Sequence, residues 1–109
     1  MRRVWKQEEL LEFLQNNPLG VEVHIGDLDD LNGKDYIFFD YISENEIPSD
    51  DGAMYQTMVQ LTICVRDYEH RKILSRFLRE HFMGSVSYEH SSEFNYYLAR
   101  MRTGLFIYE

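Results

Sequence analysis

Apolar and mixed positions alternate along residues 54–66, and this is the clearest pattern in the chain. One of the two alternating sets is mainly apolar and consists of Tyr55, Thr57, Val59, Leu61, Ile63 and Val65. The other set is mixed and includes Gln56, Gln60, Thr62 and Arg66. Because successive side chains of a strand point to opposite faces, the pattern predicts a strand with one buried face.

A helical repeat follows this strand with almost no loop between them. Asp67 is a good N-cap residue, and Glu69 lies near the positive end of the helix dipole. One stripe at helical spacing is mainly apolar and also includes His81. Its apolar members are Ile73, Leu74, Phe77, Leu78 and Phe82. Basic residues occupy the other side: Arg71, Lys72, Arg76 and Arg79. A helix over residues 67–82, ended by Gly84, should therefore fold back so that its stripe packs on Val59, Leu61 and Ile63.

The amino-terminal third predicts one helix and two strands. Residues 6–16 carry an apolar stripe formed by Leu10, Leu11, Phe13 and Leu14. This helix should end at Asn17-Pro18, because the residue before a proline avoids the helical region. Apolar and polar positions alternate over residues 21–25, which predicts a short strand. Residues 36–42 are apolar at nearly every position, which is typical of a strand covered on both faces. Trp5 is expected to anchor against the sheet.

The longest predicted loop, residues 43–53, is acidic and joins two strands that pair most simply as a hairpin. It exceeds the usual hairpin loop of about two to five residues, and such long loops are often functional or mobile. Its acidic residues and its one apolar anchor are candidate protein-interaction residues: Glu44, Glu46, Ile47, Asp50 and Asp51. We expect the loop to be mobile in the free subunit, since its like charges repel, and to order on contact with a partner. The alternative is a solvated tip with no role.

The carboxy-terminal part predicts two further strands. The first covers residues 86–88, and the second covers residues 94–102 and continues over residues 105–108 through a bulge at Gly104. The order of elements is therefore helix, three strands, helix, two strands, in a single domain of residues 1–109. This order predicts an α+β fold with an antiparallel or mixed sheet, mainly a meander, and both helices on one face.

Aromatic residues occupy both parities of the last strand, so they cannot all face one core. Arg100 and Arg102 share the parity of Phe94, Tyr96 and Leu98. Tyrosine and arginine are enriched at protein interfaces, which adds four candidate interaction residues: Tyr96, Tyr97, Arg100 and Arg102. An arginine–tyrosine face opposite the acidic loop would suit head-to-tail self-association. The pattern equally allows a sheet edge covered by the first helix.

Composition narrows the classes of protein that fit these elements. The chain has 109 residues, of which 44% are hydrophobic and 15% aromatic, and this favours a folded domain over a disordered segment. The formal net charge of −8 argues against direct nucleic-acid recognition, because phosphate contacts need a basic surface. The single cysteine, Cys64, cannot form an internal disulfide, which favours a reducing compartment such as the cytosol. No stretch resembles a signal peptide or a membrane span, so no membrane partner is expected.

No residue pattern in the sequence indicates catalysis. The four histidines have neither the close pairing nor the CxxC companion of a zinc site, and residues 27–33 do not keep the register of a calcium-binding loop. No serine lies in a glycine-flanked elbow, and no glycine-rich phosphate loop is present. Cys64 lies on a strand without a designated histidine. We therefore expect a protein that is not an enzyme and that binds no metal or other cofactor.

The order of elements resembles that of the tail terminator or tail-completion proteins of long-tailed bacteriophages and of the related head–tail joining proteins. The likeness rests on residues 10–14 leading to residues 17–20, on the strand of residues 36–41, and on residues 58–65 running straight into residues 66–74. It covers almost the whole chain and rests on element order and hydrophobic pattern. No functional residue is transferred from it.

The resemblance implies a role in virion assembly. Such proteins form a ring, commonly a hexamer, on the end of the tail tube, where the ring stops tube growth and docks to the head. The implied partners are further copies of the chain, tail-tube proteins and head-connector proteins. The implied location is the cytoplasm of the bacterial host during assembly, and then the virion. A different class also fits: small acidic inhibitors or immunity-type proteins, which mask a basic protein partner by charge complementarity.

Overall fold

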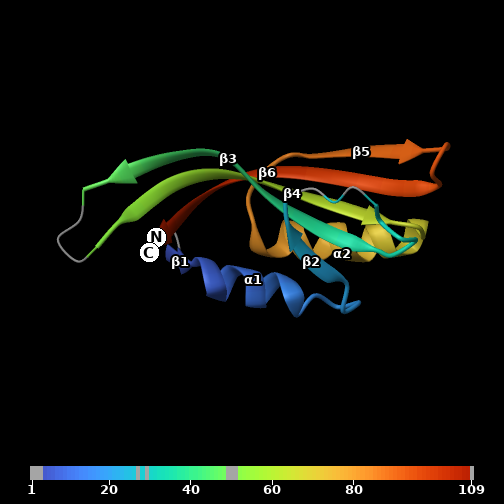
Figure 1. Cartoon of the computed structure of the whole chain (residues 1–109), viewed down its shortest axis with the longest axis horizontal. Coiled ribbons are helices and arrows are strands. Elements are labelled where there is room, and N and C mark those ends of the chain that lie inside the picture. The colour runs from blue at the N-terminus through green and yellow to red at the C-terminus, as the bar shows by residue number, and fades with distance from the viewer. Residues whose placement is uncertain (1–3, 27, 29, 49–51, 109) are drawn as a thin grey trace.

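The strands form one mixed six-stranded sheet, and both helices lie on the same side of it (Figure 1). The structure is a computed structural model, and it describes residues 4–26, 28, 30–48 and 52–108. The elements in chain order are β1 (Val4–Lys6), α1 (Gln7–Gln15), β2 (Glu22–Ile25), β3 (Tyr36–Ile47), β4 (Met54–Val65), α2 (Tyr68–His81), β5 (Val86–Ser91) and β6 (Tyr96–Tyr108). The strand order across the sheet is β1-β6-β4-β3-β2, with β5 also paired to β6. The predicted strand of residues 54–65 is therefore the central one.

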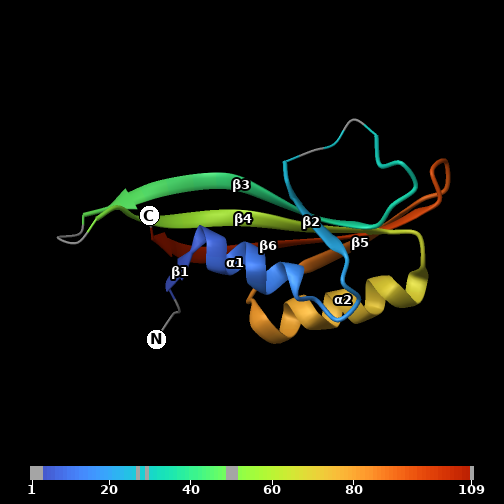
Figure 2. The same ribbon diagram turned by 60° about the horizontal axis from the view of Figure 1, so that its bottom comes forward.

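The predicted α+β class, with a mixed sheet and two helices, is confirmed, but the order of elements is only partly right. The predicted order lacks β1, a strand of three residues that is too short to show an alternating pattern. The predicted meander is wrong at β2, which runs parallel to β3. Between them, residues 28 and 30–35, which we call the arching loop, lie over the open face of the sheet, the face away from the helices (Figure 2). That crossing is what makes the two strands parallel.

The register between β4 and β6 is unbroken along its whole length. Pairing runs from Met54 opposite Tyr108 to Val65 opposite Tyr97, and Gly104 lies opposite Met58 within it. The bulge predicted at Gly104 is therefore wrong. The one register shift between β3 and β4 lies in β3, between Tyr41 and Ser43.

The main core lies between the helices and the sheet face that they cover. Val59, Leu61 and Ile63 are fully buried on this face, as predicted. From α2, Leu74 and Leu78 are buried in the same cluster and Phe77 packs against it. Ile73 was predicted to join them, but 41% of it is exposed. It lies at the flank of the stripe, in a shallow groove beside Asn16 and Pro18 at the end of α1.

The helix ends follow local chemistry. The Asp67 side chain accepts hydrogen bonds from the backbone N–H groups of Glu69 (2.8 Å) and His70 (3.2 Å), which confirms the predicted N-cap. Trp5 is buried at the start of α1, and its ring centre lies 5.3 Å from that of Phe13, so the predicted anchor is also confirmed. Neither of the two described helices is long and apolar enough to cross a membrane.

A second, smaller core lies on the open face of the sheet. It contains Tyr36, Phe38, Cys64 and Tyr96, and Leu28 and Leu31 of the arching loop pack against it. Tyr36 and Phe38 face this cluster, whereas Ile37 and Phe39 face the main core. The first part of β3 is therefore covered on both faces, as its run of apolar residues predicts.

Gly84, between α2 and β5, is a position where the fold leaves no room for a side chain. A Cβ atom there would overlap the backbone carbonyl oxygen of Arg102 in β6. Since a backbone group cannot rotate away, we expect Gly84→Ala to lower the free energy of unfolding by about 1–3 kcal/mol in urea denaturation. Gly104→Ala is the matched control, because the nearest atom to a Cβ there is the Thr57 carbonyl oxygen at 3.9 Å. Equal stability of the two variants would show that the segment after α2 does not lie against β6 as described.

Candidate functional site

The hairpin end of β3 and β4, residues 43–47 and 54–58, carries the first group of predicted interaction residues. β3 pairs with β4 as far as Ile47 opposite Met54, so residues 43–47 are strand and the connection is residues 48–53. The predicted loop of residues 43–53 is therefore wrong in its first five residues. Their acidic side chains are exposed at the edge of the sheet, where charges are compatible with strand pairing, so charge alone did not mark the end of the strand. Asp50 and Asp51 lie outside the described residues.

Glu44 and Glu46 point to one side of this hairpin end. They lie opposite Thr57 and Tyr55 and are both exposed, whereas Ile47 is half-buried opposite Met54. β2 pairs only with the stretch from Tyr36 to Phe39, so no described strand pairs with the outer edge of residues 43–47. The hairpin end extends past both helices (Figures 1 and 2). It therefore presents an unpaired strand edge and two carboxylates to its surroundings.

The predicted residues of β6 lie at some distance from that end and on two faces. Tyr96, Arg100 and Arg102 share the open face, as their parity predicts, and Tyr97 lies on the opposite face. Tyr96 is buried, and its hydroxyl donates to the Lys34 carbonyl oxygen at 3.3 Å. This tyrosine therefore serves the chain's own second core.

The two arginines of the open face have partners within the chain. Arg100 forms an ion pair with Glu89 of β5. The Nε–H of Arg102 donates to the Gln60 side-chain oxygen at 3.1 Å. These contacts across neighbouring strands hold both side chains along the sheet.

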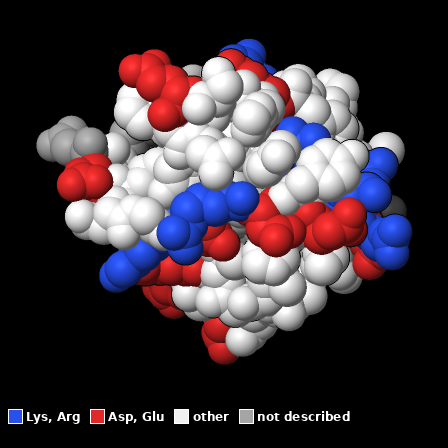
Figure 3. Space-filling view, turned by 90° about the vertical axis from the view of Figure 1, so that its right-hand side faces the viewer, with Lys and Arg blue, Asp and Glu red and all other residues white. Residues whose placement is uncertain are grey.

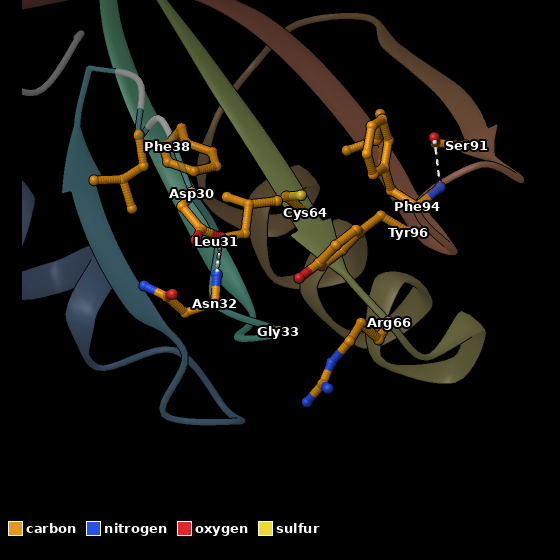
Figure 4. A pocket seen from close by; sticks show the side chains of 12 residues that line it. Asp30, Leu31, Asn32, Gly33, Phe38, Cys64, Arg66, Ser91, Phe94 and Tyr96 are labelled. Carbon is orange, nitrogen blue, oxygen red and sulfur yellow. Dashed lines mark hydrogen bonds between the residues drawn. The ribbon is translucent and has the colours of Figure 1, made fainter.

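A cavity of about 770 Å³ opens on the open face, between the arching loop and the turn that joins β5 to β6. Figure 4 shows Leu31 and Asn32 on one wall, Phe94 and Tyr96 on the other, and Cys64 between them. Phe94 is 68% exposed at this rim. The walls are mainly apolar, and they come from segments far apart in the chain, so no local sequence pattern indicates the cavity.

Cys64 contributes a thiol to the lining of the cavity, and its surroundings suppress the reactivity of that thiol. Burial raises the pKa of its thiol to about 11, and the carboxylate of Asp35 acts in the same direction. The thiol is therefore protonated at neutral pH, and a protonated thiol is a poor nucleophile.

A third surface is a groove of about 240 Å³ between α2 and β5, which we call the α2–β5 groove. Tyr88 lines the groove from β5. The α2 wall carries four basic residues and a serine: Arg71, Lys72, Arg76, Arg79 and Ser75. The sequence indicates that these basic residues share a side of the helix. It does not indicate that β5 meets that side, because the position of β5 is set by its long-range pairing with β6.

Arg71 is the cation that joins the two walls of the α2–β5 groove. Its guanidinium carbon lies 5.0–5.3 Å from the centres of three tyrosine rings, those of Tyr68, Tyr88 and Tyr97. Its Nη1 donates to the carbonyl oxygens of Glu89 at 3.1 Å and Leu98 at 3.4 Å. Cation–π contacts and hydrogen bonds to backbone carbonyls thus hold α2 against the β5–β6 hairpin.

Charges of both signs occur at the end of the molecule where α2 begins. Figure 3 shows basic and acidic side chains interspersed among uncharged residues on this end of the molecule. Arg66 lies 3.6 Å from the Asp35 carboxylate, and Lys72 lies 3.9 Å from that of Glu69. Arg76 and Arg79, by contrast, form no ion pair within the described part of the chain.

Comparison with known proteins adds no family to this picture. No protein-family model matches the chain, and no curated protein matches it. Within the described residues, no three or more histidine, cysteine, aspartate or glutamate side chains gather in a group that would hold a metal ion. The three surfaces described above are therefore the basis for any functional proposal.

Proposed function

We propose that this protein is a non-enzymatic virion assembly protein of a bacteriophage or prophage, either a tail terminator or another head–tail joining component. Copies of the chain form a ring that caps the tail tube and docks to the head. The observation that carries the proposal is the hairpin end, which extends past the helices and exposes the carboxylates of Glu44 and Glu46 beside an outer edge that no described strand pairs. Such an edge is suited to contact with another protein chain.

The element order supports the same proposal. After the short strand β1, a helix precedes three strands of which two form a long hairpin, a second helix packs on the sheet, and two strands follow. Apart from β1, this is the order on which the resemblance to tail terminator and head–tail joining proteins rests. A ring also needs two different surfaces on each copy, because a contact that uses one surface twice closes as a dimer.

The alternative is a small acidic inhibitor or immunity-type protein, and the net charge of −8 favours it. Sedimentation velocity at several protein concentrations separates the two. A ring-forming protein should yield one closed oligomer whose size stops growing as concentration rises. A monomer at every concentration, binding a basic protein instead, would overturn the ring and support the inhibitor.

The role in tail assembly has its own test in the phage or prophage that encodes the chain. Without the protein, electron microscopy should find tails of uncontrolled length and filled heads without tails, because nothing caps the tube. Wild-type particle numbers and tail lengths in its absence would contradict the role in virion assembly, whatever the oligomeric state of the purified chain.

A further inference from the structure

The α2–β5 groove concentrates positive charge in an acidic chain. Lys72, Arg76 and Arg79 are exposed along one side of α2, and Arg71 lies at the inner wall. Of these, Lys72 lies near Glu69, while Arg76 and Arg79 have no ion pair within the described residues. Such a cluster favours an anionic occupant over a neutral one.

Two buried polar atoms at the groove point to the same kind of occupant. The Ser75 side chain is 1% exposed, and its Oγ has no hydrogen-bond partner among the described residues. The Nε of Arg71 is also buried, and it too has no partner in that part of the chain. A buried polar group without a hydrogen bond costs about 1–3 kcal/mol, so its presence calls for a partner outside the chain. Arginine Nε–H is a donor only and a serine hydroxyl donates readily, so the missing partner is an acceptor such as a carboxylate oxygen.

The chain itself carries carboxylates that match this groove. Glu44 and Glu46 stand on one side of an extended strand, about 6.6–6.8 Å apart along it. Lys72 and Arg76 are one helical step of four residues apart, which is about 6 Å along α2. Two neighbouring carboxylates of the hairpin end therefore match two neighbouring cations of the groove.

A copy of the chain cannot place its own hairpin end in its own groove. The molecule measures 49 × 28 × 22 Å, and the hairpin end lies at the opposite end of its long axis from the start of α2 (Figures 1 and 2). The carboxylates therefore reach only the groove of another copy. Because the two surfaces differ, the contact is head-to-tail, and repetition of such a contact gives a ring when the rotation closes.

We propose that the α2–β5 groove binds the acidic side of the hairpin end of a second copy, with Glu44 and Glu46 against Lys72 and Arg76 and with a carboxylate oxygen accepting from Ser75. This inference rests on the proposed function, because it names the two surfaces that join neighbours in the ring. It replaces Arg100 and Arg102 as the basic side of the contact, since both of those arginines have polar partners within the chain, whereas of Lys72 and Arg76 only Lys72 lies near a carboxylate within the described residues.

Complementary charge reversals test the contact by sedimentation velocity at low salt. Lys72→Glu with Arg76→Glu makes the groove acidic, and Glu44→Lys with Glu46→Lys makes the hairpin end basic. Each double variant alone should associate at least a hundredfold more weakly than the wild-type chain. An equimolar mixture should associate again, because each copy then meets a neighbour of opposite charge. Glu8→Lys with Glu12→Lys, on the exposed side of α1, is the control for net charge and should associate as the wild type does.

Ser75→Ala tests whether the carboxylate reaches the floor of the groove. The substitution removes a hydroxyl that bonds to none of the described residues, so the variant should be at least as stable as the wild type. Its association should nevertheless weaken by about tenfold or more, because a hydrogen bond to a charged group is lost. Unchanged association would contradict this hydrogen bond.

The outcomes separate this inference from the proposed function. If the wild-type chain forms closed oligomers but the charge-reversed variants and their mixture behave like it, the inference is wrong and the ring stands. If the wild-type chain stays monomeric at every concentration, the ring itself is wrong.

Discussion

Phe39→Ala should lower the free energy of unfolding by about 3–5 kcal/mol, the largest stability effect that we expect from a single substitution. Phe39 has no exposed surface, faces the main core opposite Leu61, and lies with its ring centre 5.0 Å from that of Tyr41. Truncation removes buried apolar surface and leaves a cavity that β3, paired on both edges at this position, cannot collapse to fill. Urea denaturation at one fixed protein concentration measures the effect, because association raises the apparent stability.

Phe94→Ala is the matched control for this substitution. It deletes the same side chain from the turn between β5 and β6, where Phe94 is 68% exposed. Its stability should stay within about 0.5 kcal/mol of the wild type. A similar loss in both variants would mean that β3 is not packed between the helices and the arching loop.

Asn17→Ala should cost about 2–4 kcal/mol, because one buried side chain satisfies the backbone where α1 turns into β2. Its Nδ2 donates to the carbonyl oxygens of Leu14 at 2.9 Å and Val21 at 2.8 Å. Its Oδ1 accepts from the backbone N–H groups of Leu19 at 3.2 Å and Val21 at 2.9 Å. Alanine leaves both polar groups of the buried Val21 without these bonds.

The neighbouring Asn16 offers the control for Asn17. Its side chain is exposed, and its backbone N–H donates to Glu12 at 3.1 Å in a bond that alanine preserves. Asn16→Ala should therefore change stability by no more than about 0.5 kcal/mol in the same urea series. If Asn17→Ala were equally mild, water would have to replace the amide at this turn, and the junction would be more open than described.

The sequence predicted the elements that carry a clear apolar pattern or a local capping residue of their own. The alternation from Tyr55 to Val65 and the stripe of α2 predicted β4, α2 and the packing between them. The Asp67 cap was also predictable, because it depends only on the following two or three residues. The run of apolar residues at the start of β3 predicted a strand covered on both faces, and the arching loop covers its second face.

The elements that the sequence did not predict depend on distant partners. β1 is a strand only because it pairs with the last three residues of β6. Residues 43–46 look like a loop because they are polar, yet they pair with β4 while their side chains stay exposed. A strand as short as β1, or as exposed as residues 43–46, carries no alternating apolar pattern that would mark it in the sequence.

For the candidate site, the sequence identified charged residues but not which of them are already paired. Arg100 and Arg102 were predicted as an interaction face, but Glu89 and Gln60 hold them within the sheet. The basic residues of α2 were predicted as one side of the helix, and the approach of β5 turns that side into a groove. Only the folded structure shows that the arginines of β6 have polar partners within the sheet and that the basic residues of α2 line a groove.

Electron microscopy of the associated wild-type protein tests the central claim most directly, namely that copies join head-to-tail into a closed ring. Class averages should show a closed ring, and a reconstruction should place the hairpin end of each copy against α2 and β5 of the next. The contradictory result is a population of monomers only, or of two-fold dimers in which the same surface of both copies meets.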